Sequence, residues 1–597
     1  MSMINIKSTT WFDFLPIEII VDIFNYLSNN DIIYTFFYFN QRFNNLLLQN
    51  QCYFNYLEFP TRNLEFWRNI FSIIGSRIEF LNINTINFSL SLKYFPSIKS
   101  LILSSPIDVL DEQLKSILES EQFQKIHSFK IKENRLYFDR LYDNYLNNQD
   151  YLIKKILNDQ NSLKIFQYSL ITLPLSLIGI SNLKINFNLY SLTLILTDFR
   201  DIFTLISYTP NLTYLNVQLK PPYRFQELTH KINIKLKQLH LKLSDNETRE
   251  YPLSNDVQLF NGIKQFSSSL ICLSLNLVGL DIETRNEIRF NSIKLQQFLE
   301  SMIELKQFHL YAKLNKDPID IDNILSSFSG KFWFDHNLSF GMHGRYFYTL
   351  PFYFNDLLEF YEGFDGVQSN SIEILETNPR MWYHVKSIEL LVTYNYNLNF
   401  VKELKIKMPK LTLIKFGNIG FSSTHKTVNL CQEEKFDVQL DNVTTIEFTH
   451  GSIENKKEWL INVTPNLKYL FLWFTELSSI DNQLASILTK RIQQLNISTY
   501  IELEQLTMIS DVYFSNVQYI IFGLNDGGMK PQDYAAFIMK ILRNFQNLKT
   551  LIIYIIPISC FYIELHEIIQ NLDMNEIINN YQVQQFREYC LFSKKSS

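Results

Sequence analysis

Residues 11–48 have the sequence WFDFLPIEIIVDIFNYLSNNDIIYTFFYFNQRFNNLLL, which is too apolar to be stable as an isolated segment. Pro16 favours the first turn of a helix, because its fixed φ suits that position and its missing N–H is not needed there. We expect this helix to end near Leu27, because residues 28–30 are a Ser-Asn-Asn run that favours a break.

The expected first helix is polar along one narrow stripe only. Glu18, Asp22 and Asn25 recur at i, i+4 and i+7, and the remaining positions of the helix are almost all apolar. Two shorter helices are predicted to follow, one from Asp31 behind an asparagine cap and one from near Asn40. Three such helices can cover one apolar face but hardly two, so the remaining face requires a neighbour in this chain or in another protein.

The same stretch resembles an F-box, the three-helix module that docks on the Skp adaptor of SCF ubiquitin ligases. The matching residues are Leu15-Pro16-x-Glu18, Ile23-Phe24-x-Tyr26-Leu27, Asp31 and Asn40-x-Arg42-Phe43-x-x-Leu46. Phe43 stands where many members have tryptophan, and another large aromatic side chain should be tolerated there. The alternative is an N-terminal helical cap on a larger core.

The resemblance implies a set of adaptor-binding residues. They are Leu15, Pro16, Glu18, Ile20, Ile23, Phe24, Leu27 and Asp31. Through the adaptor, the resemblance also implies contact with cullin and RING subunits.

Composition excludes several other classes. The chain has 597 residues, of which 46% are hydrophobic and 19% charged, and its 15 glycines and 16 prolines are too few for long flexible linkers. A net charge of −5 without a dense Lys/Arg run argues against nucleic acid as a partner. We expect no membrane span and no secretion signal, and five scattered cysteines fit a reducing compartment, the cytoplasm or the nucleus.

The rest of the chain repeats a short unit, apolar-x-x-apolar-x-apolar. Apart from one interruption, its copies mostly start 23 to 37 residues apart, and its last two apolar positions alternate as in a β-strand. The middle apolar residues of the copies are Leu101, Phe129, Phe166, Leu192, Leu215, Leu239, Leu273, Phe308, Ile388, Ile414, Ile446, Leu470, Leu495, Ile520 and Leu551. Several spacers have helical periodicity, for example residues 111–121 and 531–542.

Strand, helix and strand at this period resemble an irregular leucine-rich repeat. The asparagine that this family carries three residues after the last strand leucine is missing, since Leu241 is followed there by Ser244 and Leu310 by Lys313. We therefore expect an α/β protein, with an N-terminal three-helix F-box followed by an irregular leucine-rich-repeat solenoid of parallel strands and outer helices. The rival fold is an ordinary α/β domain with parallel strands.

Six segments follow from these patterns. They are an F-box-like helical module at 8–50, a linker and N-terminal solenoid cap at 51–95, a repeat segment at 96–315, an aromatic-rich insert or pair of degenerate repeats at 316–384, a second repeat segment at 385–572, and a C-terminal helix with a frayed tail at 573–597. The insert could be a hairpin, and the last helix is expected at 574–592.

No catalytic, cofactor-binding or metal-ligating residue is predicted. The chain has no HExxH, GxSxG or Walker A motif, and the glycines at 523–528 lack the Lys-Ser/Thr of a P-loop. His336 and His343 lie seven residues apart without an ordered third ligand. An unrecognised hydrolase or transferase is the alternative of another class.

Binding is the function that the repeat favours, because residues between the apolar strand positions point away from the core. The candidate target-binding residues are the aromatic Tyr469, Phe471, Trp473 and Tyr519. A more polar row lies at Tyr214, Gln238 and Gln307. The insert or the C-terminal helix could instead cover the aromatic row, and the two possibilities stay open.

The sequence thus predicts a non-catalytic substrate-recognition subunit of an SCF-type ubiquitin ligase, with a Skp-type adaptor at one end and an unidentified target protein on the repeat. The alternative within the binding class is a scaffold that works without cullin.

Overall fold

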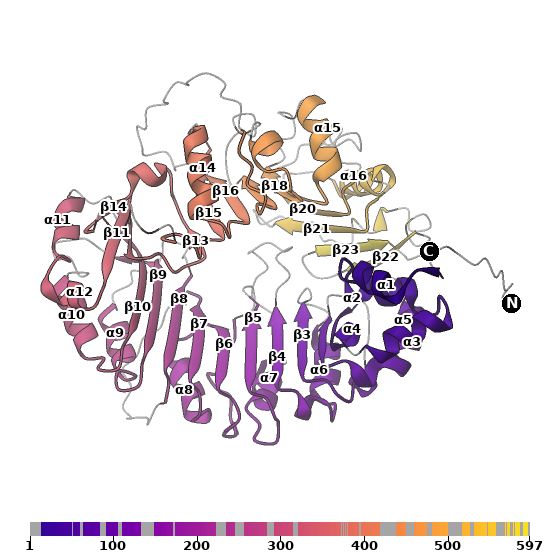
Figure 1. Cartoon of the computed structure of the whole chain (residues 1–597), viewed down its shortest axis with the longest axis horizontal. Helices are drawn as coiled ribbons and strands as arrows, with labels where there is room; N and C mark the ends of the chain where they lie inside the picture. Colours follow the sequence, from indigo (N-terminus) through magenta and orange to yellow (C-terminus); the bar gives the residue numbers. More distant parts are fainter. Residues whose placement is uncertain are drawn as a thin grey trace, which may run out of the picture. The chain divides into compact units, whose positions relative to one another are not determined.

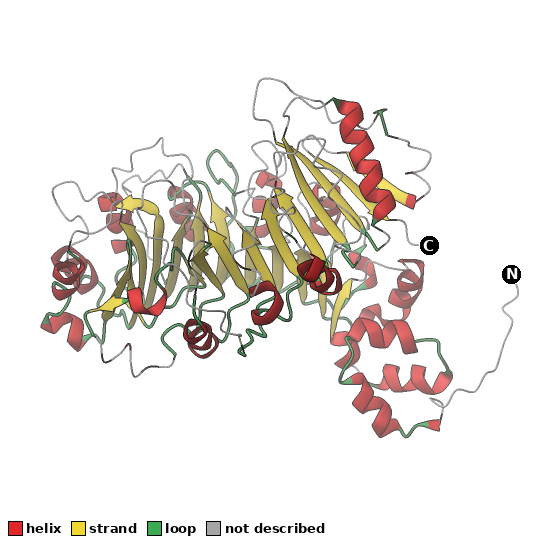
Figure 2. Cartoon of the chain, turned by 90° about the horizontal axis from the view of Figure 1, so that it is seen from above, coloured by secondary structure: helices red, strands yellow, loops and turns green. Residues whose placement is uncertain are grey.

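The computed structural model of this chain forms two compact units, Met1–Lys237 and Gln238–Ser597. Both contain mostly parallel strands that alternate with helices, so the chain is an α/β protein (Figures 1 and 2). The structure describes residues 14–50, 52–59, 64–83, 91–104, 110–132, 149–170, 174–221, 235–244, 256–282, 292–314, 320–371, 373, 375, 378, 380–392, 394, 396–417, 437–448, 456, 459–473, 480, 482–498, 516–525, 530–545, 547–556, 568, 570–572, 577, 580–585 and 589–594.

Three short helices open the first unit: α1 (Ile17–Phe24), α2 (Asn29–Phe36) and α3 (Gln41–Gln49). The first helix ends at Phe24 rather than at Leu27, because the N–H group of Leu27 turns back to the carbonyl of Phe24 (3.1 Å). The second begins two residues before the predicted Asp31, since Ser28 rather than Asn30 caps it and accepts the N–H of Asp31 (3.2 Å). The third begins directly after Asn40, which confirms that prediction.

Aromatic packing holds these helices together. Phe24 of α1 lies 4.9 Å from Phe36 of α2, and Phe36 stacks on Phe43 of α3 at 5.3 Å between ring centroids. All three side chains are buried. The three-helix module therefore has its own small core.

Parallel strands build the remainder of the first unit in sequence order. They are β1 (Tyr56–Phe59), β2 (Phe80–Ile83), β3 (Ser100–Ser104), β4 (Ser128–Lys132), β5 (Ile165–Ser169), β6 (Ser191–Leu196) and β7 (Tyr214–Leu219). The helices are α4 (Cys52–Asn55), α5 (Leu64–Ile74), α6 (Leu110–Leu118), α7 (Gln149–Ile156) and α8 (Arg200–Tyr208). Since β1 and β2 pair in parallel with the strands that follow, the sheet begins at Tyr56, well before the predicted residue 96.

The second unit begins with three parallel strands and continues into a hairpin. The order is β8 (Gln238–Leu243), β9 (Cys272–Ile282), β10 (Gln307–Leu314), β12 (Tyr346–Leu350), β11 (Ser339–His343) and β14 (Gln368–Ser369). The helices are α9 (Asp256–Lys264), α10 (Ser292–Glu300), α11 (Ile321–Ser326) and α12 (Lys331–Asp335).

The aromatic-rich insert contains an antiparallel hairpin, which was one of the two possibilities that the sequence left open, and also a strand, β13 (Asp356–Leu357), that pairs in parallel with β15 (Ser387–Leu391). Strands β11 and β12 pair antiparallel around a tight turn, where Gly344 has a φ of +50° that favours glycine. Every residue of both strands is buried, so the aromatic side chains pack against the rest of the unit. The segment is thus part of the core rather than a loose loop.

A second, largely parallel sheet completes the second unit. Its order is β13 (Asp356–Leu357), β15 (Ser387–Leu391), β16 (Leu413–Gly417), β17 (Thr445–Phe448), β18 (Tyr469–Trp473), β19 (Gln494–Ser498), β20 (Tyr519–Asn525), β21 (Thr550–Ile556), β23 (Tyr589–Lys594) and β22 (Tyr581–Gln585). The helices include α14 (Leu398–Lys407), α15 (Asn482–Arg491), α16 (Pro531–Asn544) and the π-turn η8 (Trp459–Val463). Every predicted strand position of the repeated unit lies in one of the observed strands.

The predicted C-terminal helix at 574–592 is wrong. Residues 581–585 and 589–594 form the strands β22 and β23, and β23 pairs antiparallel with β21. The pairing satisfies the backbone groups of β21, which would otherwise form a free sheet edge. The strand also reaches Lys594, so Ser593 and Lys594, which were predicted to be frayed, are paired, while residues 595–597 of that tail lie outside the described residues.

Asparagines connect successive units of the repeat. Each of these asparagines stands directly before the first apolar residue of its unit. Its side-chain N–H donates to a backbone carbonyl of the preceding unit, that of the residue two positions before the first apolar residue there. The pairs are Asn188 to Asn161 (2.7 Å), Asn211 to Phe187 (2.9 Å), Asn442 to Pro409 (2.8 Å), Asn466 to Asp441 (2.9 Å) and Asn516 to Lys490 (3.5 Å). We call this set the asparagine ladder. It satisfies carbonyls in the turns that precede the strands, whereas the asparagine missing from the sequence would lie after the strand.

Candidate protein-interaction surfaces

The outer side of α1 exposes apolar side chains. Ile19 is 44% exposed and Tyr26 is 89% exposed, while Leu27 is partly exposed and Ile23 is half-buried. We call these four residues the α1 stripe: Ile19 and Ile23 lie one turn apart on α1, and Tyr26 and Leu27 follow in the turn that ends the helix, where their N–H groups donate to the carbonyls of Ile23 and Phe24. Within the described residues nothing covers Tyr26, so the stripe is a surface on which a partner could bury apolar area.

Two of the predicted adaptor-binding residues belong to the core instead. Ile20 and Phe24 are each 1% exposed, and Phe24 packs on Phe36 and on Tyr53 (5.5 Å). Their inward direction follows from helix geometry, because they lie one turn apart on the side opposite Glu18 and Asp22. An adaptor could reach them only if the module unfolded.

The other predicted adaptor-binding residues lie at the surface to different degrees. Pro16, Glu18 and Asp31 are exposed and Leu15 is half-buried. Sequence reasoning missed Phe14 and Ile19, which expose large apolar surfaces beside them. The apolar character of Phe14 and Ile19 does not reveal that they are exposed, because their exposure depends on where the neighbouring helices lie.

Side chains of α2 fasten the module to the first strand of the sheet. Asn29 donates to the carbonyl of Tyr56 (2.9 Å), and Asn30 donates to the carbonyl of Glu58. Both carbonyls belong to β1, whose described partner is β2 alone, so the amides occupy the free edge of the sheet. Arg77 adds a bond to the carbonyl of Leu48 at the end of α3. Figure 1 shows α1 to α5 gathered at the β1 end of this sheet.

The aromatic candidates on the repeat are only partly accessible. Tyr469, Phe471 and Tyr519 lie on the sheet face away from the helices and are half-buried. Trp473 lies at the end of β18, and its side chain is outside the described residues. The neighbouring side chains on this face, those of Asn496 and Ile521, are buried. The row is therefore less open than an exposed hot spot.

A row of alternating charge leads along β15, β16 and β17 to Phe471. It consists of Glu389, Lys415 and Glu447, which are register neighbours, and Lys415 and Glu447 form an ion pair of 3.2 Å. Burial opposes the charge of Lys415, but Glu447, Asp356 and Glu389 together raise its pKa. Burial raises the pKa of Glu389. Lys415 thus pairs with one of the two carboxylates of the row, that of Glu447.

The residues of the polar row differ in how far they are buried. Tyr214 is half-buried, and Gln238 and Gln307 are exposed. Tyr311 on β10, at the end of this row, is fully buried, and its hydroxyl accepts the N–H of Leu358 (2.9 Å).

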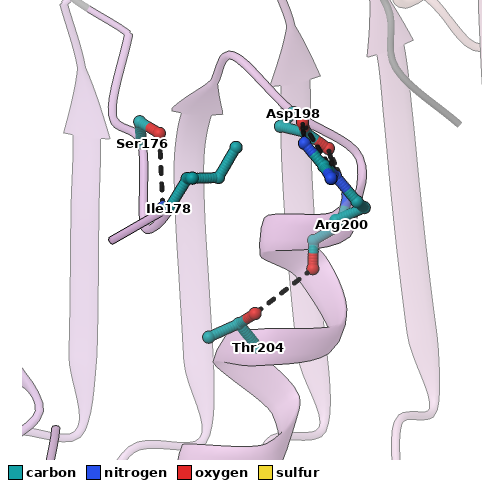
Figure 3. Close-up of polar contacts among 5 residues, drawn as sticks. All are labelled: Ser176, Ile178, Asp198, Arg200 and Thr204. Carbon is teal, nitrogen blue, oxygen red and sulfur yellow. Dashed lines mark hydrogen bonds and ion pairs between the residues drawn. The ribbon is translucent and has the colours of Figure 1, made fainter. Parts of the chain in front are cut away.

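A buried acidic cluster lies where β6 meets α8. Figure 3 shows the Arg200 guanidinium against the Asp198 carboxylate, with the closest N–O distance 2.6 Å. Asp201, one residue further, is 1% exposed, and its Oδ2 has no hydrogen-bond partner among the described residues. Burial raises the pKa of Asp201 to about 7, although the N–H of Leu177 opposes this shift.

Two further buried groups are structural. Lys456 is buried beside the rings of Tyr396 and Phe416 and donates to the carbonyl of Tyr394 (2.7 Å), and burial lowers its pKa to about 8. His343 contacts the carbonyl of Leu358 (2.8 Å) within the hairpin core. Within the described ranges, no group of three or more His, Cys, Asp or Glu side chains could hold a metal ion.

These features define an α/β protein whose mostly parallel sheets alternate with helices, with an exposed apolar helix side at its N-terminal module. A scan against protein-family models gives no match for this chain, and a search of the curated proteins gives none either. Among the helices of the described residues, none has both the length and the apolar character that crossing a membrane requires.

Proposed function

We propose that this chain is the substrate-recognition subunit of an SCF-type ubiquitin ligase, with an F-box at its N-terminus and an irregular leucine-rich-repeat solenoid behind it. The F-box binds a Skp-type adaptor through the α1 stripe, and the solenoid binds a target protein. This function places the chain in the cytoplasm or the nucleus and requires no chemistry from the chain itself.

The observation that carries the proposal is the exposed α1 stripe on a module with a complete core of its own. Phe24 packs on Phe36 of α2 and Ile20 is buried, whereas Ile19 and Tyr26 are exposed, so we infer that their apolar area is not needed for folding. Burying one such side chain contributes roughly 1.5–3 kcal/mol. A partner that covers the stripe therefore gains several such contributions.

The attachment of the module to β1 supports the same function. A ligase subunit must hold its target at a defined distance from the adaptor, and a loose tether would not do so. The bonds from Asn29 and Asn30 to the edge of β1 fix α2 on the first strand of the sheet. Movement of the module relative to β1 would expose these carbonyls.

Recovery of the chain from cells tests the assignment. We expect affinity purification of the full chain to recover a Skp-type adaptor together with a cullin and a RING subunit in comparable amounts. Adaptor without cullin would instead support the scaffold function. Recovery of neither protein would contradict the F-box assignment, provided that the purified chain is folded by circular dichroism.

A further inference from the structure

A group of aromatic and basic side chains lies at the surface of the second unit, before β15 and β16. It consists of Tyr353, Tyr383, His384, Lys386 and Lys410, which we call the basic aromatic patch. Tyr353 and Tyr383 are both 37% exposed, and Lys410 Nζ lies 4.1 Å from the centroid of the Tyr383 ring. His384 connects the two tyrosines, with ring centroids 5.3 Å from Tyr353 and 5.6 Å from Tyr383.

Two imidazoles fix the tyrosine at the centre of the patch. The Tyr353 ring stacks on His309 of β10 at 4.0 Å and is nearly parallel to His240 of β8 at 6.0 Å. The neighbouring backbone is also held, because Lys386 donates its N–H to the carbonyl of Asn355 (2.7 Å). The exposed edge of Tyr353 is thus a rigid surface that loses little entropy when a ligand binds.

The lysines of the patch differ from their neighbours on α14. Lys405 is paired with Asp441 (3.2 Å) and Lys407 with Glu403 (2.7 Å), whereas no carboxylate of the described residues forms an ion pair with Lys386 or Lys410. Asp356 is already paired with Lys242 (3.2 Å). Lys410 and His384 both contact Tyr383, and burial, followed by the charges of Lys410 and Lys386, lowers the pKa of His384.

We propose that the basic aromatic patch binds an acidic peptide segment of a partner protein, with Lys386 and Lys410 pairing its carboxylates and the rings of Tyr353 and Tyr383 contacting its apolar atoms. Charge complementarity selects such a segment, because the two ammonium groups lack carboxylate partners in the described part of the chain. Aromatic rings at the centre provide contact area at low entropic cost.

The patch is too small for nucleic acid. A protein that neutralises a phosphate backbone typically uses roughly six or more cationic contacts. This patch offers two lysines, and the whole chain carries a net charge of −5. The proposal does not rest on the adaptor assignment, because the patch lies in residues 353–410 and α1 is unchanged in every variant below.

Fluorescence anisotropy of the full chain with a short fluorescein-labelled glutamate-rich peptide tests the proposal. We expect saturable binding that Lys386→Gln with Lys410→Gln weakens by about tenfold or more. The matched control is Lys405→Gln with Lys407→Gln, which removes the same charge from lysines that are already paired. It should leave the affinity within about threefold. Tyr383→Ala, which keeps both charges, should also weaken binding because it removes the aromatic contact.

Three results would overturn the proposal: no binding of the peptide, an equal loss in both double variants, and tighter binding of a single-stranded oligonucleotide of the same length. An equal loss would show that only the overall charge of the chain matters. All of the lysines changed are exposed except Lys407, which is half-buried, and a thermal melt of each variant confirms that folding is intact.

Discussion

Asp201 is a buried side chain whose ionisation should affect stability. Its folded-state pKa of about 7 lies above the ordinary value of 3.8, because burial disfavours the carboxylate. The folded state therefore holds a proton that the unfolded chain releases. The stability that this group contributes is complete below pH 3.8 and is lost as the pH rises through about 7.

We predict that Asp201→Asn removes this pH dependence. The shift corresponds to about 4 kcal/mol as an upper limit, so the variant should gain stability relative to the parent at pH 8 and none at pH 4. Thermal melts of both proteins at the two pH values measure the difference. Parallel pH profiles for parent and variant would show that Asp201 is not the group responsible.

At the scale of single elements, the asparagine ladder shows what sequence analysis overlooked. The ladder asparagines precede the first apolar residue of the unit, and the tetrapeptide Thr-Pro-Asn-Leu occurs twice, at 209–212 and 464–467. In both copies the threonine is buried and its hydroxyl donates to a carbonyl of the preceding helical turn, at 2.8 and 2.9 Å. The repeated tetrapeptide was visible in the sequence, but the bonds of its asparagine join residues more than 20 positions apart and required the structure.

We predict that Asn211→Ala and Asn466→Ala each reduce stability by about 0.5–1.5 kcal/mol through the lost hydrogen bond. Lys235→Ala is the control, because Lys235 is exposed and occupies the same position before Leu236. Thermal melts should show a lower midpoint for the asparagine variants only. Equal midpoints for all three would mean that water replaces the ladder bonds without cost.

Neighbouring residues of β18 should give different results. Leu470 is fully buried, so Leu470→Ala should cost about 2–5 kcal/mol through lost burial and a cavity. Phe471 is half-buried on the other face, and Phe471→Ala should cost less while weakening capture of a target. Thermal melts paired with target pull-downs separate the two effects. Equal destabilisation would place Phe471 in the core and exclude it as a target contact.

Alternation of apolar residues predicted the strands of the repeat, because one buried sheet face imposes a period of two. The same reasoning failed at the C-terminus, where the free edge of β21 recruits β23 and turns a helix-like segment into strands. It also did not separate Ile20 from Ile19 on α1, because both are apolar and the sequence does not show how far the neighbouring helices cover the side opposite Glu18 and Asp22. The local sequence pattern carries no information about long-range strand pairing and side-chain packing, which decide both cases.

At the scale of the whole molecule, the proposed function requires that one chain presents both an adaptor-binding module and a target-binding repeat. The proposed adaptor binding should be separable from folding, because the residues of the α1 stripe are not among Phe24, Phe36 and Phe43, whose rings form the core of the module. Loss of adaptor binding without loss of folding is the signature that distinguishes an exposed docking surface from an internal packing face.

The affinity of the purified full chain for a purified Skp-type adaptor tests this claim most directly. Ile19→Asp with Tyr26→Ala should weaken binding by about a hundredfold or more, because two apolar contacts are lost. Ile17→Asp is the matched control, since Ile17 is 45% exposed, almost the same as Ile19, but points to another side of α1. We predict tight binding by the parent, near-parental binding by Ile17→Asp and a large loss in the double variant. No binding by the parent, or equal affinities for all three proteins, would contradict the account.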